Sequence, residues 1–431
     1  MIPRLLALLP LAFLMLMYAF FAPDYPFKDQ WELPLLLEKM HTDGLGLSDF
    51  WAQHNEHRLL FPRLVMLFLA RLSHWNVLWE QAVNLLLGMG IFAFWVLQAR
   101  RSLERKPLGW LLPLLSLLAF SLAQWGNWFL GWQLQEFMNV LALCAACYWL
   151  ATPNWPHCLA AALAGIVATY SFANGLLVWP LGLAILLYAE NQPRWKMTPK
   201  RAFWTVIGVL VITSYLYGYQ RPPHHPPFWS FIKHPVDFVL YFFKYLGQPV
   251  CNFSGITSVG AAMFGVVGLS HWLSMRLPLL RGSKKYLASR WAPLAALGAY
   301  AVLSALLTGA ARIEMGGSDQ AMSPRYVTMA NLFWFSLLIM AWMHFSPTEK
   351  PKPGRVACVV VAACIGLSSL WGAYKWTERY NAYAPARQAL VEGSNDEVLK
   401  RLYPDVETLL ERREILKRYR YSLFSKTPPT E

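Results

Sequence analysis

Two carboxylates stand three residues apart shortly after the first apolar run of the chain. They are Asp29 and Glu32, in the stretch DYPFKDQWELPLLLEKM. On a helical turn, side chains at this spacing share one face. A carboxylate held near a bilayer surface beside apolar residues can have its pKa raised enough to act as a general base on a hydroxyl group. In the simpler alternative, one carboxylate caps a helix and the other is solvated.

A second polar group follows at residues 54–58, which have the sequence HNEHR. If this segment is helical, His54, His57 and Arg58 share one face. The H-x-x-H spacing lacks the other ligands of a zinc site, so a divalent metal is not favoured and no cofactor is predicted. Imidazole and guanidinium donors suit a phosphate better, because arginine offers two parallel donors. Arg63 adds a further cation a few residues later.

Polar residues also gather among tryptophans in the segment AQWGNWFLGWQLQEF, which begins at Ala123. Such residues are costly at membrane depth unless they line a cavity, and aromatic rings beside amides suit the stacking and hydroxyl recognition of a sugar. An interfacial belt of tryptophans is the competing explanation. The candidate sugar- or acceptor-binding residues are Gln124, Asn127, Trp128, Gln133, Glu136 and, from the later segment YSFANGLLVWP, Asn174.

The segment ARIEMGGSDQAMSPRY carries Arg312 and Arg325 on either side of a pair of glycines. Such a loop could close over an anionic lipid headgroup, and Tyr326 could orient one of the arginines. Arginines at the ends of spans are also common snorkelling anchors. Further cations occur in GYQRPPHHPPFW, namely Arg221, His224 and His225.

These residues belong to a chain that is too apolar for a soluble domain of its size. Of its 431 residues, 56% are hydrophobic and only 14% are charged, and its mean hydropathy is +0.33. Apolar runs long enough to span a bilayer recur along most of the length, which predicts an all-α polytopic membrane protein with about 11 transmembrane helices. The expected spans are 5–22, 76–98, 110–124, 134–151, 158–172, 175–189, 203–219, 254–275, 291–310, 327–345 and 356–373.

The net charge of +14 could by itself suggest nucleic acid as a partner. The basic residues, however, fall in short connections between the apolar runs, which is the pattern of membrane orientation. We therefore predict no nucleic acid partner, a cytoplasmic N-terminus and an extracytoplasmic C-terminus. The segments on the outer face are then 24–75, 220–253, 311–326 and the chain after residue 374.

Two parts of different composition follow from this topology. Residues 1–373 form the membrane domain, whose outer loop 24–75 is long enough for amphipathic helices lying on the membrane surface. Residues 374–431 are mixed in charge, and Leu399, Leu402 and Leu409 recur at helical spacing. This part is predicted to be a small extracytoplasmic helical tail, either a cap on the outer face or a solvated extension.

The stretches DQWE, HNEHR, AQWGNW with GWQ, and SPRY, together with this architecture, resemble the GT-C superfamily and in particular a bacterial subgroup of it. GT-C proteins are integral-membrane glycosyltransferases that take a sugar from a polyprenyl-phosphate carrier on the non-cytoplasmic face. The likeness covers nearly the whole chain, and the architecture is its main carrier. The chain departs from the family pattern at one point, because D-x-x-E at Asp29 and Glu32 replaces two adjacent acidic residues or D-x-D.

The resemblance implies an inverting transfer in the bacterial inner membrane, from a polyprenyl-phosphate-linked sugar to a glycan or lipid acceptor of the envelope. In that family the loop carboxylate, here Asp29 with Glu32 as the alternative, deprotonates the acceptor hydroxyl. Basic residues stabilise the polyprenyl phosphate that leaves. The residues expected at the donor phosphate are His54, His57, Arg58, Arg63, Arg312, Arg325 and Tyr326.

Two other functions fit the same residues. A transporter or flippase of lipid-linked glycans would also need cations and aromatic rings, although the chain lacks the matching pair of broken spans that an inverted repeat would give. A non-catalytic envelope-assembly protein could use the outer tail as a binding platform. Asp29 separates these functions, because Asp29→Asn should abolish transfer and leave assembly intact, and transport could survive the change.

Overall fold

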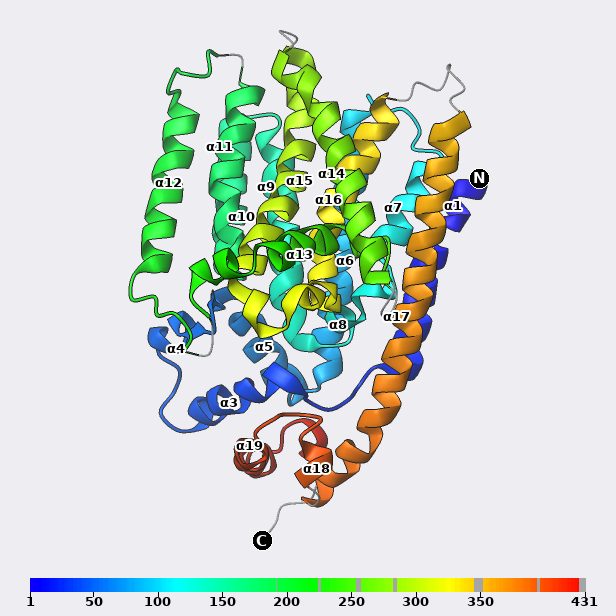
Figure 1. Ribbon diagram of the computed structural model, residues 1–431. Coiled ribbons are helices and arrows are strands. Elements are labelled where there is room, and N and C mark those ends of the chain that lie inside the picture. Colours follow the sequence, from blue (N-terminus) through cyan, green and yellow to red (C-terminus); the bar gives the residue numbers. More distant parts are fainter. Residues whose placement is uncertain are drawn as a thin grey trace.

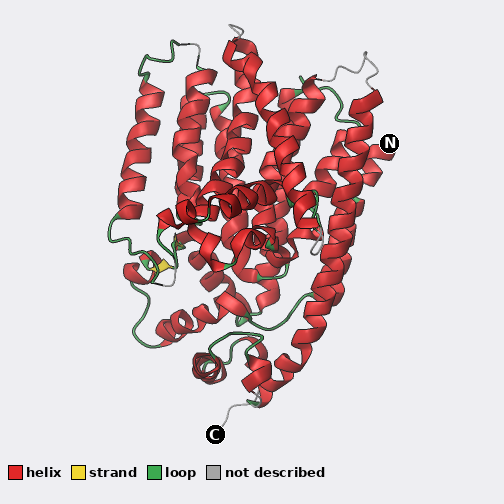
Figure 2. Cartoon of the chain, viewed as in Figure 1, coloured by secondary structure: helices red, strands yellow, loops and turns green. Residues whose placement is uncertain are grey.

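The computed structural model of the chain is helical almost throughout. It describes residues 1–190, 192–223, 226–252, 257–281, 285–344, 352–393 and 396–425. Within these ranges the only strands are β1 (Gln53–His54) and β2 (His57–Arg58), which pair antiparallel. Figure 2 shows the helices in red and this hairpin in yellow. The all-α class predicted from the sequence is confirmed.

Six stretches in the described part of the chain are long and apolar enough to cross a membrane. They fall in α1 (Ile2–Leu6) with α2 (Leu9–Phe21), α6 (Val77–Ser102), α14 (Thr257–Arg281), α15 (Lys285–Arg312), α16 (Val327–His344) and α17 (Lys352–Glu392). The bundle also contains α7 (Leu111–Ala119), α9 (Leu134–Leu150), α10 (Trp155–Thr169), α11 (Val178–Ala189) and α12 (Pro199–Leu216) (Figure 1). A multi-pass membrane protein is supported, whereas the predicted count of about 11 spans is not confirmed.

The expected span 110–124 is interrupted for a local reason. α7 has 9 residues, and at 1.5 Å per residue it reaches about 14 Å, roughly half of the hydrocarbon core. Just after it, the Gln124 side chain donates to the Ala119 carbonyl at 2.6 Å, and the Ser121 hydroxyl accepts from the Ala123 amide at 3.1 Å. These local bonds replace the helical ones. The chain continues as η2 (Leu122–Gln124), α8 (Trp125–Trp128) and η3 (Gly131–Gln133) before α9 begins.

α16 is the central helix of the bundle, since 83% of its apolar window is buried against 28% for α17. It packs against α15, α14, α7 and α6. α17 lies at the outside of the bundle (Figure 1) and contacts η2. There the Leu122 amide donates to Ser369 Oγ at 2.9 Å, and a Cβ added to Gly372 would collide with the Leu122 carbonyl. α17 is therefore attached closely to the bundle near its middle.

Residues 24–75 form surface elements at the end of the bundle opposite the N-terminus (Figure 1). They comprise η1 (Lys28–Glu32), α3 (Leu33–His41), α4 (Leu47–Trp51), the β1–β2 hairpin and α5 (Leu60–Ser73). The short helices predicted for this loop are present.

Residues 54–58 are not helical, which corrects our expectation of a shared helical face. Asn55 takes a φ of +48°, a conformation that asparagine tolerates better than most residues, and the chain reverses there. His54 and His57 are directly paired across the hairpin and so lie on the same face. Arg58 lies on the other face, because successive residues of a strand alternate.

Short elements complete the end of the bundle near this loop. η4 (Ala173–Leu177) precedes α11, and η5 (Phe228–Lys233) leads into α13 (Pro235–Gly247), which packs on α14. η6 (Ile313–Met315), η7 (Gly317–Met322) and η8 (Pro324–Tyr326) connect α15 to α16. The candidate cations His224 and His225 lie outside the described residues.

The chain after α17 is a helical cap on the surface loop. It contains α18 (Asp396–Leu399), α19 (Val406–Arg418) and η9 (Ser422–Phe424), which lie below α3 in Figure 1. The terminal nitrogens of Arg412 donate to the Glu32 carboxylate at 2.8 and 3.2 Å, and the Tyr403 hydroxyl donates to it at 2.8 Å. The predicted leucines Leu399, Leu402 and Leu409 are fully buried.

We expect Arg412→Gln to loosen this cap. The ion pair is mostly enclosed, so the variant leaves the Glu32 carboxylate without its cation, at a cost of about 1–3 kcal/mol. Limited proteolysis beyond α17 and thermal unfolding of the purified protein measure the effect. Lys400→Gln removes an exposed ion pair with Glu397 and should change little. Equal effects of the two variants would show that the ion pair between Glu32 and Arg412 does not hold the cap in place.

The pH dependence of stability provides a second check on the ion pair between Glu32 and Arg412. Burial alone would raise the pKa of Glu32, but the hydrogen bonds from Arg412 and Tyr403 outweigh it and hold the pKa below its usual 4.5. A group with a lowered folded pKa stabilises the fold above its unfolded pKa and loses that contribution as the pH falls through the folded value. The difference between wild type and Arg412→Gln should therefore be constant above about pH 5 and shrink in acid.

Candidate functional site

The Asp29 carboxylate lies in η1 and is partly buried. No hydrogen bond or ion pair to it occurs among the residues that the structure describes. It is close enough to Lys28, His54 and Arg325 for their charges to interact. Three distant parts of the sequence thus meet around one unengaged carboxylate, as expected for a reactive group rather than a cap.

Lys28 is a site residue that sequence reasoning missed. Its φ is +51°, which is strained for a lysine, and its amide donates to the Leu402 carbonyl of the tail at 2.6 Å. Burial, reinforced by the positive charges of Arg379 and Arg325, lowers the pKa of its ammonium to about 8, although Asp29 opposes the shift. The only signal in the sequence was its position beside the acid, which a solvated lysine would share.

Arg379 of α17 was also missed, because it lies more than 300 residues from η1 in the chain. Its guanidinium stands 5.0 Å from the centre of the Trp125 ring. It also lies close enough to Lys28 for their charges to interact. α17 thus supplies a cation to the surroundings of Asp29.

η1 is held on the side of the bundle by a buried carboxylate in the first turn of α6. Glu80 accepts from Gln30 Nε2 at 2.7 Å and from Trp75 Nε1 at 2.9 Å. Gln30 in turn accepts from the Phe27 amide at 3.4 Å. Because Gln30 directly follows Asp29, these bonds fix where the free carboxylate can lie.

The hairpin contributes two histidines with different surroundings. His57 Nδ1 accepts from the Ala173 amide at 3.2 Å, and its ring stacks on Phe172. Burial lowers the pKa of His57 to about 4, so it is neutral at pH 7, carries its proton on Nε2 and offers a donor without a charge. Burial also lowers the pKa of His54, although Asp29 and Glu32 oppose the shift.

Arg58 and Arg63 hold the loop backbone. Arg58 donates to the carbonyls of Tyr215, Trp51 and Tyr217 at 2.6–2.9 Å. Arg63 donates to the carbonyls of Asp49, Phe50 and Ala52. Both side chains are buried, so the structure gives them a role in positioning. All three nitrogens of Arg58 are engaged, whereas the bonds of Arg63 all come from one terminal nitrogen.

Arg312 and Arg325 are brought to the same place, as both lie close enough to His57 for their charges to interact. Arg312 forms an ion pair with Glu56 of the hairpin turn. Arg325 donates to the Tyr326 hydroxyl at 3.2 Å, so the predicted orienting contact is present. Arg325 Nε is buried and has no partner among the described residues.

A layer of buried amides supports Arg325. Asn127 Nδ2 donates to the Arg325 carbonyl at 2.8 Å and to the Glu136 carboxylate at 3.2 Å. Thr328 Oγ1, which lies 2.6 Å from Asn127 Nδ2, donates to Gln124 Oε1 at 2.7 Å. Glu136 interacts electrostatically with Arg325. These residues are therefore near the site, but their amides are largely bonded to one another.

Trp128 has a packing role that differs from the expected sugar platform. It is fully buried, stacks on Phe137, and fills the space that a Cβ of Gly88 would occupy. Trp132 is the tryptophan near the hairpin, with its ring edge to His54 at 5.1 Å. The next residue, Gln133, has a buried Oε1 with no partner among the described residues.

Asn174 adjoins the residue that bonds His57. Its Nδ2 lies 3.6 Å from Met329 Sδ, and its side chain is partly buried.

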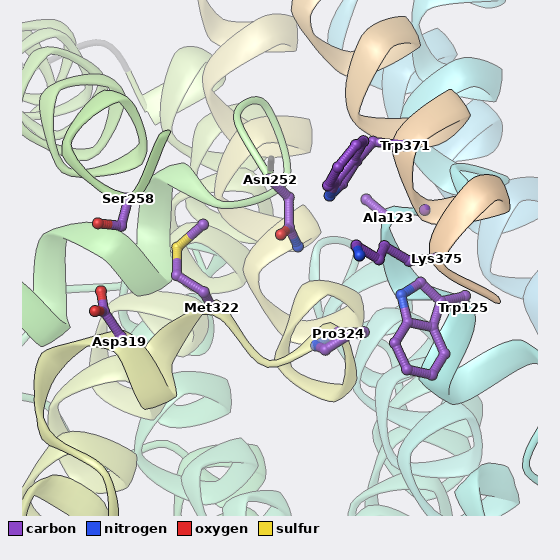
Figure 3. A pocket seen from close by; sticks show the side chains of 10 residues that line it. Ala123, Trp125, Asn252, Ser258, Asp319, Met322, Pro324, Trp371 and Lys375 are labelled. Atoms are coloured by element: carbon purple, nitrogen blue, oxygen red, sulfur yellow. The ribbon is translucent and has the colours of Figure 1, made fainter. Parts of the chain in front are cut away.

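A cavity of about 310 Å³ lies between η2, η7 and α17 (Figure 3). Its lining includes Trp125, Pro324, Trp371 and Lys375. Pro324 directly precedes Arg325, and Figure 3 shows the Lys375 side chain reaching into the cavity from α17. The cavity thus adjoins the cations around Asp29 on the side where α17 packs.

Among the described residues, no group of three or more His, Cys, Asp or Glu side chains is placed to hold a metal ion. Comparisons of the chain with protein-family models, with curated proteins and with solved structures gave no match. The site is therefore interpreted from its own residues.

Gly131→Ala should disturb the site without touching Asp29. A Cβ at Gly131 would fall 2.8 Å from Gln30 Nε2 and closer still to the Glu80 carboxylate. The hydrogen bonds that hold η1 must therefore shift, which should lower the free energy of unfolding by about 1–3 kcal/mol. Gly366→Ala is the control, because a Cβ there meets nothing within 4 Å. Thermal unfolding should show a clear loss of stability for the first variant only, and an unchanged midpoint for Gly131→Ala would contradict the proposed support.

Proposed function

We propose that the protein is a membrane glycosyltransferase of the GT-C type, which transfers a monosaccharide from a polyprenyl-phosphate carrier to an acceptor hydroxyl with inversion. The observation that carries the proposal is the partly buried Asp29 carboxylate, unengaged among the described residues and surrounded by cations. A base and a phosphate-binding group side by side are what such a transfer needs. An assembly platform would not require an unengaged acid at this place.

In the proposed reaction, Asp29 accepts the proton of the acceptor hydroxyl. The acceptor oxygen forms a bond to the anomeric carbon as the bond from that carbon to the phosphate oxygen breaks. The electron pair leaves with polyprenyl phosphate, whose charge increases at that moment. Glu32 is not the base in this scheme, because Arg412 and Tyr403 already engage both of its oxygens.

The leaving phosphate is assigned to Lys28 and Arg325. Lys28 is charged at pH 7, and Arg325 has a buried Nε–H with no partner among the described residues. Donors aimed at a developing charge in a site that excludes water are worth more than in water. His57 adds a neutral donor, whereas the charge of Arg312 is already paired with Glu56 of the hairpin.

The lipid carrier is assigned to the cavity beside α17. Its aromatic lining, Trp125 and Trp371, suits an isoprenoid chain. Lys375 lines the cavity, and Arg379, one turn later on α17, lies near Lys28, so the two form a row of cations from the cavity toward Lys28. In this proposal the surface loop 24–75 lies on the extracytoplasmic face of the bacterial inner membrane. The acceptor is a glycan or lipid of the envelope.

Asp29→Asn should abolish release of polyprenyl phosphate from a panel of polyprenyl-phosphate sugars, with membrane extract supplying the acceptor. We expect a fall of at least about 10²–10⁴-fold, the usual contribution of general base catalysis. Glu32→Gln is the comparison variant. It loosens the tail that helps to position η1 and so should lower the activity, but by a smaller factor than Asp29→Asn, because the base is still present. Release that needs Glu32 and not Asp29 would reverse the assignment. A folded wild-type protein that releases nothing from any donor would favour a transporter or an assembly protein.

The pH profile tests Lys28. Because the pKa of Lys28 is lowered to about 8, its charge is present at pH 7 and is lost above about 8, so kcat/KM should fall on that side. Lys28→Arg keeps its charge and should move the falling limb upward by at least about one pH unit. Lys39→Met, on the exposed face of α3, should leave the profile unchanged. If kcat/KM of Lys28→Arg fell at the same pH as that of wild type, loss of the Lys28 charge could not be the cause of the fall.

A further inference from the structure

A hollow of about 1380 Å³ is lined by residues from the N-terminus and from the loop after α6. The N-terminus lies at the end of the bundle opposite the tail (Figure 1). Six basic side chains and a single carboxylate, that of Glu104, line it. The basic residues come from four parts of the chain, namely Arg4 of α1, Arg100 and Arg101 of α6, Arg105 and Lys106 of the loop after α6, and Arg290 of α15.

Most of these cations have no fixed counter-charge. Arg101 donates to the Tyr148 carbonyl and lies over the Tyr148 ring at 3.7 Å, and Arg290 pairs with Glu104. The other four cations are exposed and form no ion pair within the described part of the chain. They are Arg4, Arg100, Arg105 and Lys106. Like charges gathered around a hollow repel one another, so the arrangement favours an anion inside it.

Basic residues on one face of a membrane protein can serve only to orient it. The loop 194–201, at the same end of the bundle, shows how such residues are arranged where, among the described residues, they line no comparable hollow. Its Arg201 is buried, pairs with Glu190 at 2.8 Å and donates to nearby backbone carbonyls. Its Arg194 lies over the Tyr188 ring at 4.3 Å. Lys200 of that loop also pairs with Glu190. Three of its cations are thus engaged by nearby residues, whereas the loop after α6 arranges its cations around a hollow.

The backbone of the loop after α6 is strained where it carries these charges. Glu104 and Arg105 have φ values of +56° and +62°, which are costly for residues other than glycine. The Arg105 amide donates to the Arg100 carbonyl at 2.7 Å, which fixes this turn at the end of α6. Strained backbone of this kind is concentrated at binding sites.

Apolar surface continues from the hollow. Leu97, Leu108 and Leu112 share its lining with the cations. Trp110 is 60% exposed and directly follows the loop, and exposed tryptophan is typical of the level of lipid headgroups. The hollow thus combines a basic part at headgroup level with an apolar part directed along the helices.

We propose that this hollow binds the phosphate of an anionic membrane phospholipid, with its acyl chains beside Leu97 and Leu112. Exposed cations hold a dissolved phosphate only weakly, because water and salt screen them. A phosphate carried by the bilayer is present at high local concentration beside them. The proposal does not depend on the transferase activity, since the hollow lies at the other end of the molecule.

The test is lipid binding by the full-length protein, first stripped of lipid in neutral detergent. Binding is measured by native mass spectrometry with short-chain phosphatidylglycerol, phosphatidylcholine, glycerol phosphate and inorganic phosphate. Wild type should prefer phosphatidylglycerol over phosphatidylcholine at least tenfold. The double variant Arg100→Gln with Arg105→Gln should lower the affinity for phosphatidylglycerol about fivefold for each charge removed.

Two controls separate this site from general charge. Arg194→Gln with Lys196→Gln removes two exposed cations from the other loop at this end and should leave lipid binding unchanged. Arg100→Lys with Arg105→Lys keeps the orientation signal and should retain most of the binding. Equal losses in the two glutamine variants, equal affinity for the two lipids, or binding of free phosphate as tight as that of lipid would overturn the proposal.

Discussion

The position of the Asp29 carboxylate depends on two other carboxylates. Glu80 binds η1 from the bundle through Gln30, and Glu32, the last residue of η1, binds Arg412 of the tail. Each is satisfied by donors that come from a different part of the chain, so η1 is positioned only when α6, the surface loop and the tail are all in place. The segment that carries Asp29 is thereby fixed without any bond to Asp29 itself. This leaves its charge available, which a side chain bonded for stability cannot offer.

The density of polar residues at 54–58 has a physical origin in the hairpin. A short hairpin and loop at the edge of the bilayer leave carbonyl groups that neither a helix nor bulk water satisfies. Arg58 and Arg63 satisfy four of these loop carbonyls between them. Arg58 also donates to the Tyr215 and Tyr217 carbonyls at the end of α12. Arginine suits this role because its planar fork keeps its charge and offers several donors in fixed directions. In the same segment, His57 lies near Arg312 and Arg325, Glu56 pairs with Arg312, and His54 lies near Asp29.

The sequence was sufficient for the class of protein, the surface helices after the first span and the helical tail, because these depend on apolar runs and on periodicity along one segment. It also singled out Asp29 and Arg325, which the fold brings together. It could not reveal that Glu32 is engaged by Arg412, since that contact joins residues 380 apart. The turn at Asn55 was too short for any periodicity to show it. The packing of Trp128 against Gly88 could not be foreseen, because a tryptophan that packs against a glycine has the same local sequence as one that faces a ligand.

α17 has a mechanical consequence for the site. It is a single helix of 41 residues, about 60 Å long at 1.5 Å per residue, and it is attached to η2 at Gly372, halfway along its length. This contact divides the helix into two parts of about 30 Å each, and the lower part contains Pro385. A tilt of about 5°, of the kind that a change in bilayer thickness produces, would move each end by roughly 2–3 Å. The lower part carries Arg379 and the tail that holds Lys28 and Glu32, so a tilt of α17 would change the spacing of the charges around Asp29.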